Sequence, residues 1–176
     1  MQHMKIQTTL VILVGWMAWS STAQADMEFG AGARLAVPTG DFSSAVDMGY
    51  GIEGYVGYGF DMPLLHIRPE LRVAYTEFDE ERSGMPSVGA WRFLGGAKVA
   101  LGEIVRPFVD AHLGYSIYSP SGFDDEGSIT MDMGAGLDIT ILPVMDIGGG
   151  IGYNLMWPGG NDIGWFDFGV WVTFNF

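Results

Sequence analysis

The chain of 176 residues contains no cysteine and only eight lysines and arginines, against 21 aspartates and glutamates. The absence of cysteine excludes disulfide scaffolds, thiolate zinc sites, cysteine nucleophiles and a lipidated N-terminal cysteine. The shortage of basic residues leaves a formal net charge of −13, which argues against nucleic acid as a partner because phosphate recognition needs basic patches. Charged residues make up only 16% of the chain and hydrophobic residues 48%, a composition that argues against intrinsic disorder.

Long hydrophobic runs are also missing. The one apolar segment, residues 10–19, has only about half of the ~20 residues that a membrane-spanning helix needs. It follows the positively charged Lys5 and precedes Ala23 and Ala25, which form an A-x-A cleavage site. The sequence therefore predicts a secretory signal peptide over residues 1–25 rather than a transmembrane anchor, and it places the remaining chain outside the cytoplasm.

Alternation with period two dominates residues 26–176, where no amphipathic helix pattern is found. In the last segment Phe166, Phe168, Val170 and the next three even-numbered residues are all apolar, and they alternate with a more polar set. Such alternation is typical of a β-strand with two different faces. The same pattern gives eight predicted strands: 27–37, 51–60, 65–76, 91–99, 105–117, 129–141, 145–155 and 165–176.

The connections between these segments alternate between short and long. The breaks after the second, fourth and sixth strands are tight: 61–63, 102–103 and 142–143. The others are longer and polar: 38–47, 79–87, 119–127 and 158–162. Turns at one rim and loops at the other predict an all-β fold, an eight-stranded antiparallel up-and-down β-barrel that forms one domain over residues 26–176.

Glycine and aromatic residues indicate which face of each strand points outward. Many of the 27 glycines lie on the polar face, where they suit the narrow bore of an eight-stranded barrel. The apolar face is continuous and carries aromatic residues near the strand ends, as expected at the two surfaces of a lipid bilayer. These aromatic residues are Tyr50, Phe60, Tyr75, Trp91, Tyr115, Tyr153, Phe166 and Phe176. We therefore expect a transmembrane barrel, with a soluble secreted barrel as the alternative.

The polar face also carries charges of both signs, which we expect to form a salt-bridged network that plugs the lumen. Buried charges persist only when they are paired and hydrogen-bonded. The predicted network consists of Glu28, Arg34, Glu53, Arg68, Glu70, Arg72, Arg92, Lys98, Arg106, Asp110, His112, Asp132, Asp138, Asp146 and Asp167. A narrow polar pore through the same residues is the alternative.

In its predicted strands and in a few short motifs, the chain resembles the small eight-stranded outer-membrane β-barrels of Gram-negative bacteria, the family of the OmpA transmembrane domain and OmpX. Residues 106–115 resemble a fifth-strand pattern P-Y-V-x-A-G-x-G-Y of that family, with His112 in place of a small residue, and residues 134–138 resemble its G-A-G pattern. The last strand resembles the signal that the outer-membrane assembly machinery reads, carried here by Phe166, Phe168, Phe174 and Phe176. The resemblance implies an outer-membrane location in the cell envelope.

Candidate catalytic and metal-binding residues are few. Asp110, His112 and Ser116 share the inward face, so a lipid A-modifying hydrolase or acyltransferase is conceivable, but the His-x-Ser pair of the lipid A deacylases is absent. We interpret His112 as hydrogen-bonded to lumen carboxylates. The acidic loop segments 79–81 and 124–126 could attract Ca²⁺ or Mg²⁺, although charge runs are usually solvated. We expect no catalytic residue, no metal and no cofactor.

The sequence thus predicts an integral outer-membrane protein that acts as a structural or surface-recognition barrel through four extracellular loops. A narrow pore and a lipid-modifying enzyme are the alternatives. The expected partners are outer-membrane lipid and lipopolysaccharide, the assembly machinery and an extracellular ligand of the loops.

Overall fold

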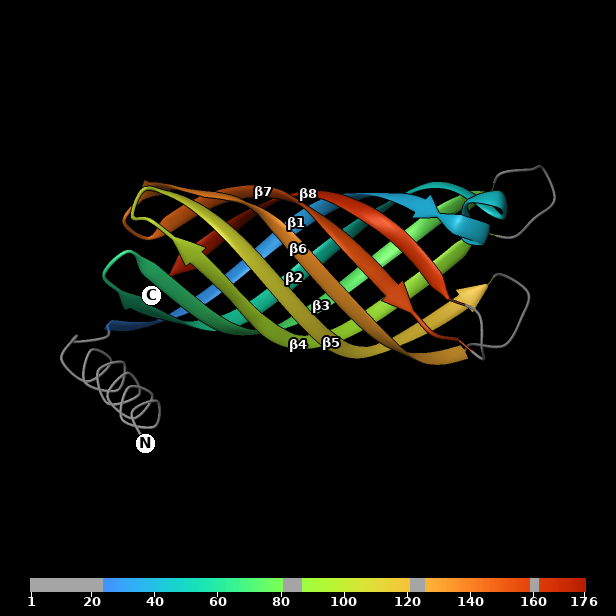
Figure 1. The fold of residues 1–176 in the computed structure, drawn as a ribbon, viewed down its shortest axis with the longest axis horizontal. Coiled ribbons are helices and arrows are strands. Elements are labelled where there is room, and N and C mark those ends of the chain that lie inside the picture. Colours follow the sequence, from blue (N-terminus) through green and yellow to red (C-terminus); the bar gives the residue numbers. More distant parts are fainter. Residues whose placement is uncertain (1–23, 81–86, 121–125, 159–161) are drawn as a thin grey trace, which may run out of the picture.

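The computed structural model describes residues 24–80, 87–120, 126–158 and 162–176 (Figure 1). The predicted signal peptide, including Ala23, lies outside the described residues except for Gln24 and Ala25, with which the first strand begins. None of the described helices is long and apolar enough to cross a membrane.

Eight antiparallel strands form a closed barrel, as the sequence predicts. Each strand pairs with its neighbours in the chain, and the last strand pairs with the first (Figure 1). The strands are β1 (Gln24–Thr39), β2 (Val46–Met62), β3 (Leu65–Glu80), β4 (Val88–Leu101), β5 (Val105–Pro120), β6 (Glu126–Leu142), β7 (Met145–Met156) and β8 (Ile163–Asn175).

Several strands extend further toward the loops than their apolar pattern predicts. The predicted third strand ends at Thr76, whereas β3 continues to Glu80, and β2 begins at Val46 rather than at Gly51. The reason is that ladder hydrogen bonds join backbone groups, which pair whatever side chains they carry. The first loop consequently contains only a short 3-10 helix, η1 (Gly40–Ser44), between β1 and β2.

The two ends of the barrel differ in their connections. Tight turns and the C-terminus gather at one end, and η1 and the opposite ends of the strands lie at the other (Figure 1). Leu64 in the β2–β3 turn has φ 64°, an uncommon conformation for a residue other than glycine. Its carbonyl accepts a hydrogen bond of 3.0 Å from the amide of Gly102, so two neighbouring turns are tied together. We refer to the end of the barrel with the tight turns as the turn end and to the opposite end as the loop end.

The outer surface of the barrel is apolar on every strand. Exposed side chains, one from each strand in order, include Phe29, Ile52, Leu71, Phe93, Leu113, Ile129, Ile151 and Val170. Aromatic pairs such as Tyr75 with Trp91 and Tyr153 with Phe166 lie on this surface, both with ring centres 4.9 Å apart. A soluble protein rarely exposes so large an apolar area, and the inward face is polar. The chain is therefore a transmembrane β-barrel, and the soluble alternative does not fit it.

Inward-facing glycines make room for the large side chains of the lumen. A Cβ atom placed on Gly96 would lie 2.5 Å from Cδ2 of His112, so only glycine fits at that position of β4. Gly148 of β7 similarly faces the side chains of Trp171 and Asp138. Long side chains from some strands thus fill the narrow bore, and glycines on other strands leave the room that these side chains need.

Candidate functional site

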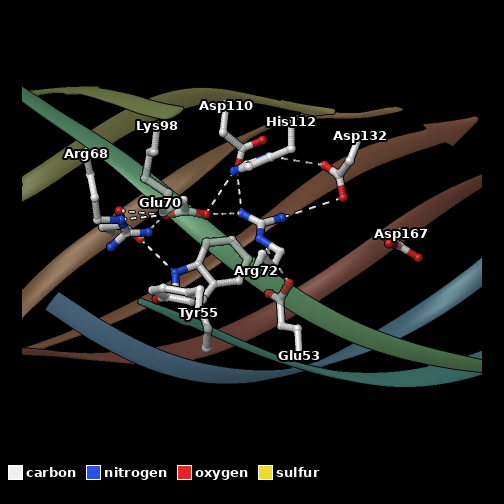
Figure 2. A network of polar contacts seen from close by, with 12 residues as sticks. Glu53, Tyr55, Arg68, Glu70, Arg72, Lys98, Asp110, His112, Asp132 and Asp167 are labelled. Atoms are coloured by element: carbon white, nitrogen blue, oxygen red, sulfur yellow. Dashed lines mark hydrogen bonds and ion pairs between the residues drawn. The ribbon is translucent and has the colours of Figure 1, made fainter. Parts of the chain in front are cut away.

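Glu70 is a buried carboxylate in the lumen with partners on β3 and β5 (Figure 2). Its oxygens accept hydrogen bonds from Arg68 Nε at 2.6 Å, Arg72 at 2.7 Å and His112 Nε2 at 3.0 Å. Arg68, Glu70 and Arg72 come from alternate positions of β3, so the pleat places all three on the inner face. The short β3 pattern Arg-x-Glu-x-Arg therefore builds the middle of the network.

Arg72 joins four strands through its guanidinium. It lies 3.5 Å from Glu53 on β2, 3.3 Å from Asp110 on β5 and 3.6 Å from Asp132 on β6 (Figure 2). Arg34 on β1 pairs with the same Glu53 at 2.6 Å. These contacts close a ring of charges across the bore.

Toward the loop end, Asp167 on β8 collects donors from several strands. It accepts hydrogen bonds from Arg34 at 3.0 Å, from Asn154 Nδ2 at 2.8 Å and from the Trp165 indole at 3.0 Å. Arg92 on β4 is fully buried and lies 3.5 Å from Asp167. Arg92 also hydrogen-bonds to Asn154, a neutral residue that charge counting alone does not identify.

Toward the turn end, the charges form smaller groups. Arg68 bonds to Glu28 at 2.8 Å, and His66 Nε2 lies 3.1 Å from the other oxygen of Glu28. Lys98 lies 3.2 Å from Asp138, and Arg106 lies 2.5 Å from Asp146. Each of these two basic side chains therefore has a carboxylate of its own.

Every predicted lumen residue takes part in at least one of these ion pairs. Ten of the charged residues are linked by ion pairs into one group, which we call the central network. It comprises Glu28, Glu53, Glu70, Asp110, Asp132 and Asp167 with Arg34, Arg68, Arg72 and Arg92.

Two apolar layers, not foreseen from the sequence, lie in the lumen. At the loop end Trp165 packs against Phe78, which packs against Phe42 of η1, in edge-to-face contacts with ring centres 5.5 Å and 5.0 Å apart. Toward the turn end Phe108 packs against Trp171 at 5.6 Å. Apart from Phe42, these residues sit at inward positions of their strands, and this parity is the signal that could have revealed them.

Little space remains in the middle of the barrel. Within the described part of the chain, a cavity of about 10 Å³ lies among Arg34, Asp110, Asp132 and Asp167, which is room for one water molecule. Larger pockets, with volumes of about 330 Å³ and about 540 Å³, lie at the turn end and at the loop end.

The residues considered for hydrolase chemistry have different hydrogen-bond partners. Ser116 Oγ lies 2.8 Å from the Ser128 hydroxyl, whereas His112 Nε2 bonds to Glu70. In the acidic loop segments, residues 81, 124 and 125 lie outside the described residues, and Glu126 is exposed at the start of β6.

The predicted assembly residues lie on the outer face of β8. Phe166, Phe168, Phe174 and Phe176 are all exposed there. The backbone of Phe176 exchanges two hydrogen bonds of 2.9 Å with Met27, and its ring stacks on Phe29 at 4.8 Å. The C-terminal residue thus completes the seam between β1 and β8.

Comparison with known proteins shows what this barrel resembles. No protein-family model matches the chain, and no curated protein sequence matches it. Among solved structures, the Neisserial surface protein A (NspA) superposes with a TM-score of 0.63 at 17% identity, covering 87% of this chain and 99% of NspA. The N-terminal β-barrel domain of Pseudomonas aeruginosa OprF gives 0.52 at 19% identity, covering 87% of this chain and all of that domain.

The outer membrane enzyme PagL is a third similar structure, with a TM-score of 0.53 at 13% identity, covering 82% of this chain and 98% of PagL. At these identities the likeness concerns the fold. The chain therefore has the fold of the small eight-stranded outer-membrane β-barrels, as its sequence resemblance implied.

Proposed function

We propose that this protein is an integral outer-membrane barrel with a structural, non-conducting lumen and a recognition surface at its loop end. The observation that carries the proposal is the filling of the bore. Arg68, Arg92, Lys98 and Trp165, four of its largest side chains, are each at most 2% exposed. They lie at two levels: Arg68 is opposite Lys98 toward the turn end, and Arg92 contacts Trp165 toward the loop end.

A conducting path would have to cross every one of these levels. At the central network, passage of an ion would require buried pairs such as Arg72 with Glu70 to separate. Breaking a buried pair by loss of one partner typically costs about 3–5 kcal/mol. An ion would then meet the apolar layer of Phe78 and Trp165, whose rings cannot replace a full shell of water, and the indole N–H of Trp165 already donates to Asp167.

The outer surface supports an outer-membrane location with lipid and lipopolysaccharide as neighbours. Closed barrels and helices are the structures that satisfy every backbone group in lipid, and the described residues form a closed barrel. The exposed phenylalanines of β8 supply the residues that the outer-membrane assembly machinery would recognise.

The loop end supports a role in recognition. Its pocket of about 540 Å³ is bordered by Asp41, Glu126 and Asp162 together with Phe42 and Tyr118. Carboxylates beside aromatic rings suit a positively charged partner. We propose no catalytic role, which is supported by the separate hydrogen-bond partners of His112 and Ser116.

Single-channel recording in planar lipid bilayers tests the closed lumen. The purified barrel, checked for folding by its heat-modifiable migration on gels, should insert without producing steady conductance. Reproducible, long-lived openings of uniform size would overturn the closed lumen and favour the narrow pore. Membrane fractionation tests the location, and recovery of the folded protein in the soluble fraction without detergent would contradict it.

A further inference from the structure

Three lumen side chains bring potential metal ligands together on one side of the barrel. Asp110 and His112 are two residues apart on β5, and Asp132 lies directly opposite His112 on β6. The pleat and the strand register therefore place all three on the inner face at neighbouring positions. One ligand atom from each side chain lies within 4.8 Å of the others (Figure 2).

One ring nitrogen of His112 is hydrogen-bonded, and the other has no hydrogen-bond partner. Nε2 lies 3.0 Å from Glu70 Oε1, and an ionised carboxylate can only accept a hydrogen bond, so Nε2 carries the proton. In the neutral imidazole, Nδ1 then carries the lone pair. Nδ1 is buried, has no hydrogen-bond partner and lies 3.9 Å from Asp132 Oδ1. A histidine oriented by a carboxylate in this way is typical of metal ligands.

Both carboxylates also leave one oxygen free. Arg72 contacts Oδ2 of Asp110 at 3.3 Å and Oδ2 of Asp132 at 3.6 Å, whereas Oδ1 of each is buried without a hydrogen-bond partner. Leaving such acceptors unsatisfied is costly. Two carboxylate oxygens and an imidazole nitrogen are thus buried without a hydrogen-bond partner, on side chains whose potential ligand atoms lie within 4.8 Å of one another.

Glycines leave a small space beside the two aspartates. The 10 Å³ cavity adjoins Asp110 and Asp132 and is bordered by Gly134, Gly150 and Gly152 of β6 and β7. A Cβ atom on Gly134 would lie 2.5 Å from Asp110 Oδ1, so the absence of a side chain there keeps this oxygen accessible.

The charge of the central network also points to a divalent cation. Its six carboxylates are joined to only four arginines, while Lys98 and Arg106 each have a separate carboxylate. The carboxylates of the network therefore outnumber its arginines by two, and His66, whose ring nitrogens both lie beside carboxylates, can offset only one of these charges. Uncompensated buried charge is strongly unfavourable, and a bound cation would offset what remains.

We propose that Asp110, His112 and Asp132 bind one divalent transition-metal ion, with zinc as the best fit to one nitrogen and two oxygen ligands. Tetrahedral zinc, with ligands at about 2.1 Å, holds them about 3.4 Å apart. The His112–Asp132 distance of 3.9 Å needs a contraction of about 0.5 Å, and a separation of 4.8 Å needs one of about 1.4 Å, which side-chain rotation must supply. Glu70 is the positioning residue that holds the His112 tautomer. The ion links β5 to β6 from inside the barrel.

Zinc titration of the folded barrel tests the site. The detergent-solubilised protein is freed of metal with a chelator and titrated with zinc chloride alone, and bound zinc is measured by calorimetry and elemental analysis. We expect one zinc ion per chain. His112→Gln and Asp132→Asn should each weaken binding at least tenfold, and His66→Gln, which changes the other lumen histidine, should leave it unchanged.

Folding of each variant is checked by heat-modifiable migration. If a variant does not fold, Asp110→Asn takes its place. Cobalt binding to the wild-type protein is a second measurement: its visible absorption, and the loss of that absorption when zinc displaces cobalt, shows whether the ion has protein ligands. Absence of stoichiometric zinc in the folded wild type would overturn the proposal. Unchanged zinc affinity in folded His112→Gln would overturn it as well.

Discussion

The guanidinium of Arg92 lies 5.0 Å from the ring centre of Trp165, and both side chains are completely buried. This contact is the boundary between the charged middle of the lumen and the apolar layer at its loop end. Arg92 faces Asp132 and Asp167 on one side and the indole ring on the other. The arginine is thus held by ion pairs and by cation–π attraction, which is stronger when water is excluded.

Replacement of Arg92 by methionine should therefore destabilise the barrel strongly. Asp132 and Asp167 would lose a buried cationic partner, and we expect the free energy of unfolding to fall by about 3–5 kcal/mol. Urea titration of the folded protein measures this change. Glu103→Gln, at an exposed turn, serves as the control and should stay within about 0.5 kcal/mol. Equal stability of the two variants would contradict the structural role of Arg92.

Glu70→Ala should have an effect of similar size, because Arg68, Arg72 and His112 would lose a common acceptor. We expect a loss of about 3–5 kcal/mol in the free energy of unfolding. Glu70→Gln keeps one acceptor oxygen and should lose less. Denaturant unfolding of both variants gives the order, and an alanine variant as stable as wild type would show that the network does not depend on Glu70.

A matched pair of glycines on β4 tests the packing of the lumen. Gly96 faces His112, whereas a Cβ atom on its neighbour Gly95 would meet only the side chain of Leu71, at an ordinary 3.5 Å. Gly96→Ala should cost about 1–3 kcal/mol through overpacking, and Gly95→Ala should be close to neutral. Thermal unfolding followed on gels separates the two. An equal loss in both variants would indicate a general effect of alanine on β4.

Deletion of Phe176 should impair assembly more than deletion of loop residues 159–161. The deletion removes two backbone hydrogen bonds to Met27 and the ring stacked on Phe29 at the seam of the barrel. We expect a clear fall in the amount of folded protein in the membrane fraction. Normal membrane levels of the deleted protein would refute the assembly role.

Much of the fold could be predicted because strand alternation is a local property. In β8 the parity of Phe168 and Trp171 alone places one outside and the other inside, and the structure agrees. Strand ends were less predictable. The polar residues beyond Thr76 carry no apolar pattern, yet they continue β3 because their backbone groups find partners on β2 and β4.

The sequence predicted which charged residues face the lumen, but it did not predict which of them contact one another. Parity places Arg72 and Glu53 on the inner face without indicating that they meet, because a partner depends on strand register and on how the barrel closes. Phe42 was missed for a related reason. It lies in a loop with no alternation, and only the packing of η1 over the barrel mouth brings it to Phe78.

The sequence by itself determined that the chain is an eight-stranded barrel with an apolar outside and a charged inside. This follows from a period of two, which every strand carries in its own residues. Only the tertiary structure decided that Asp110, His112 and Asp132 lie close together while Arg72 contacts Oδ2 of both aspartates. Such contacts join three strands across a closed bore, and their geometry is set by closure and register rather than by any local pattern.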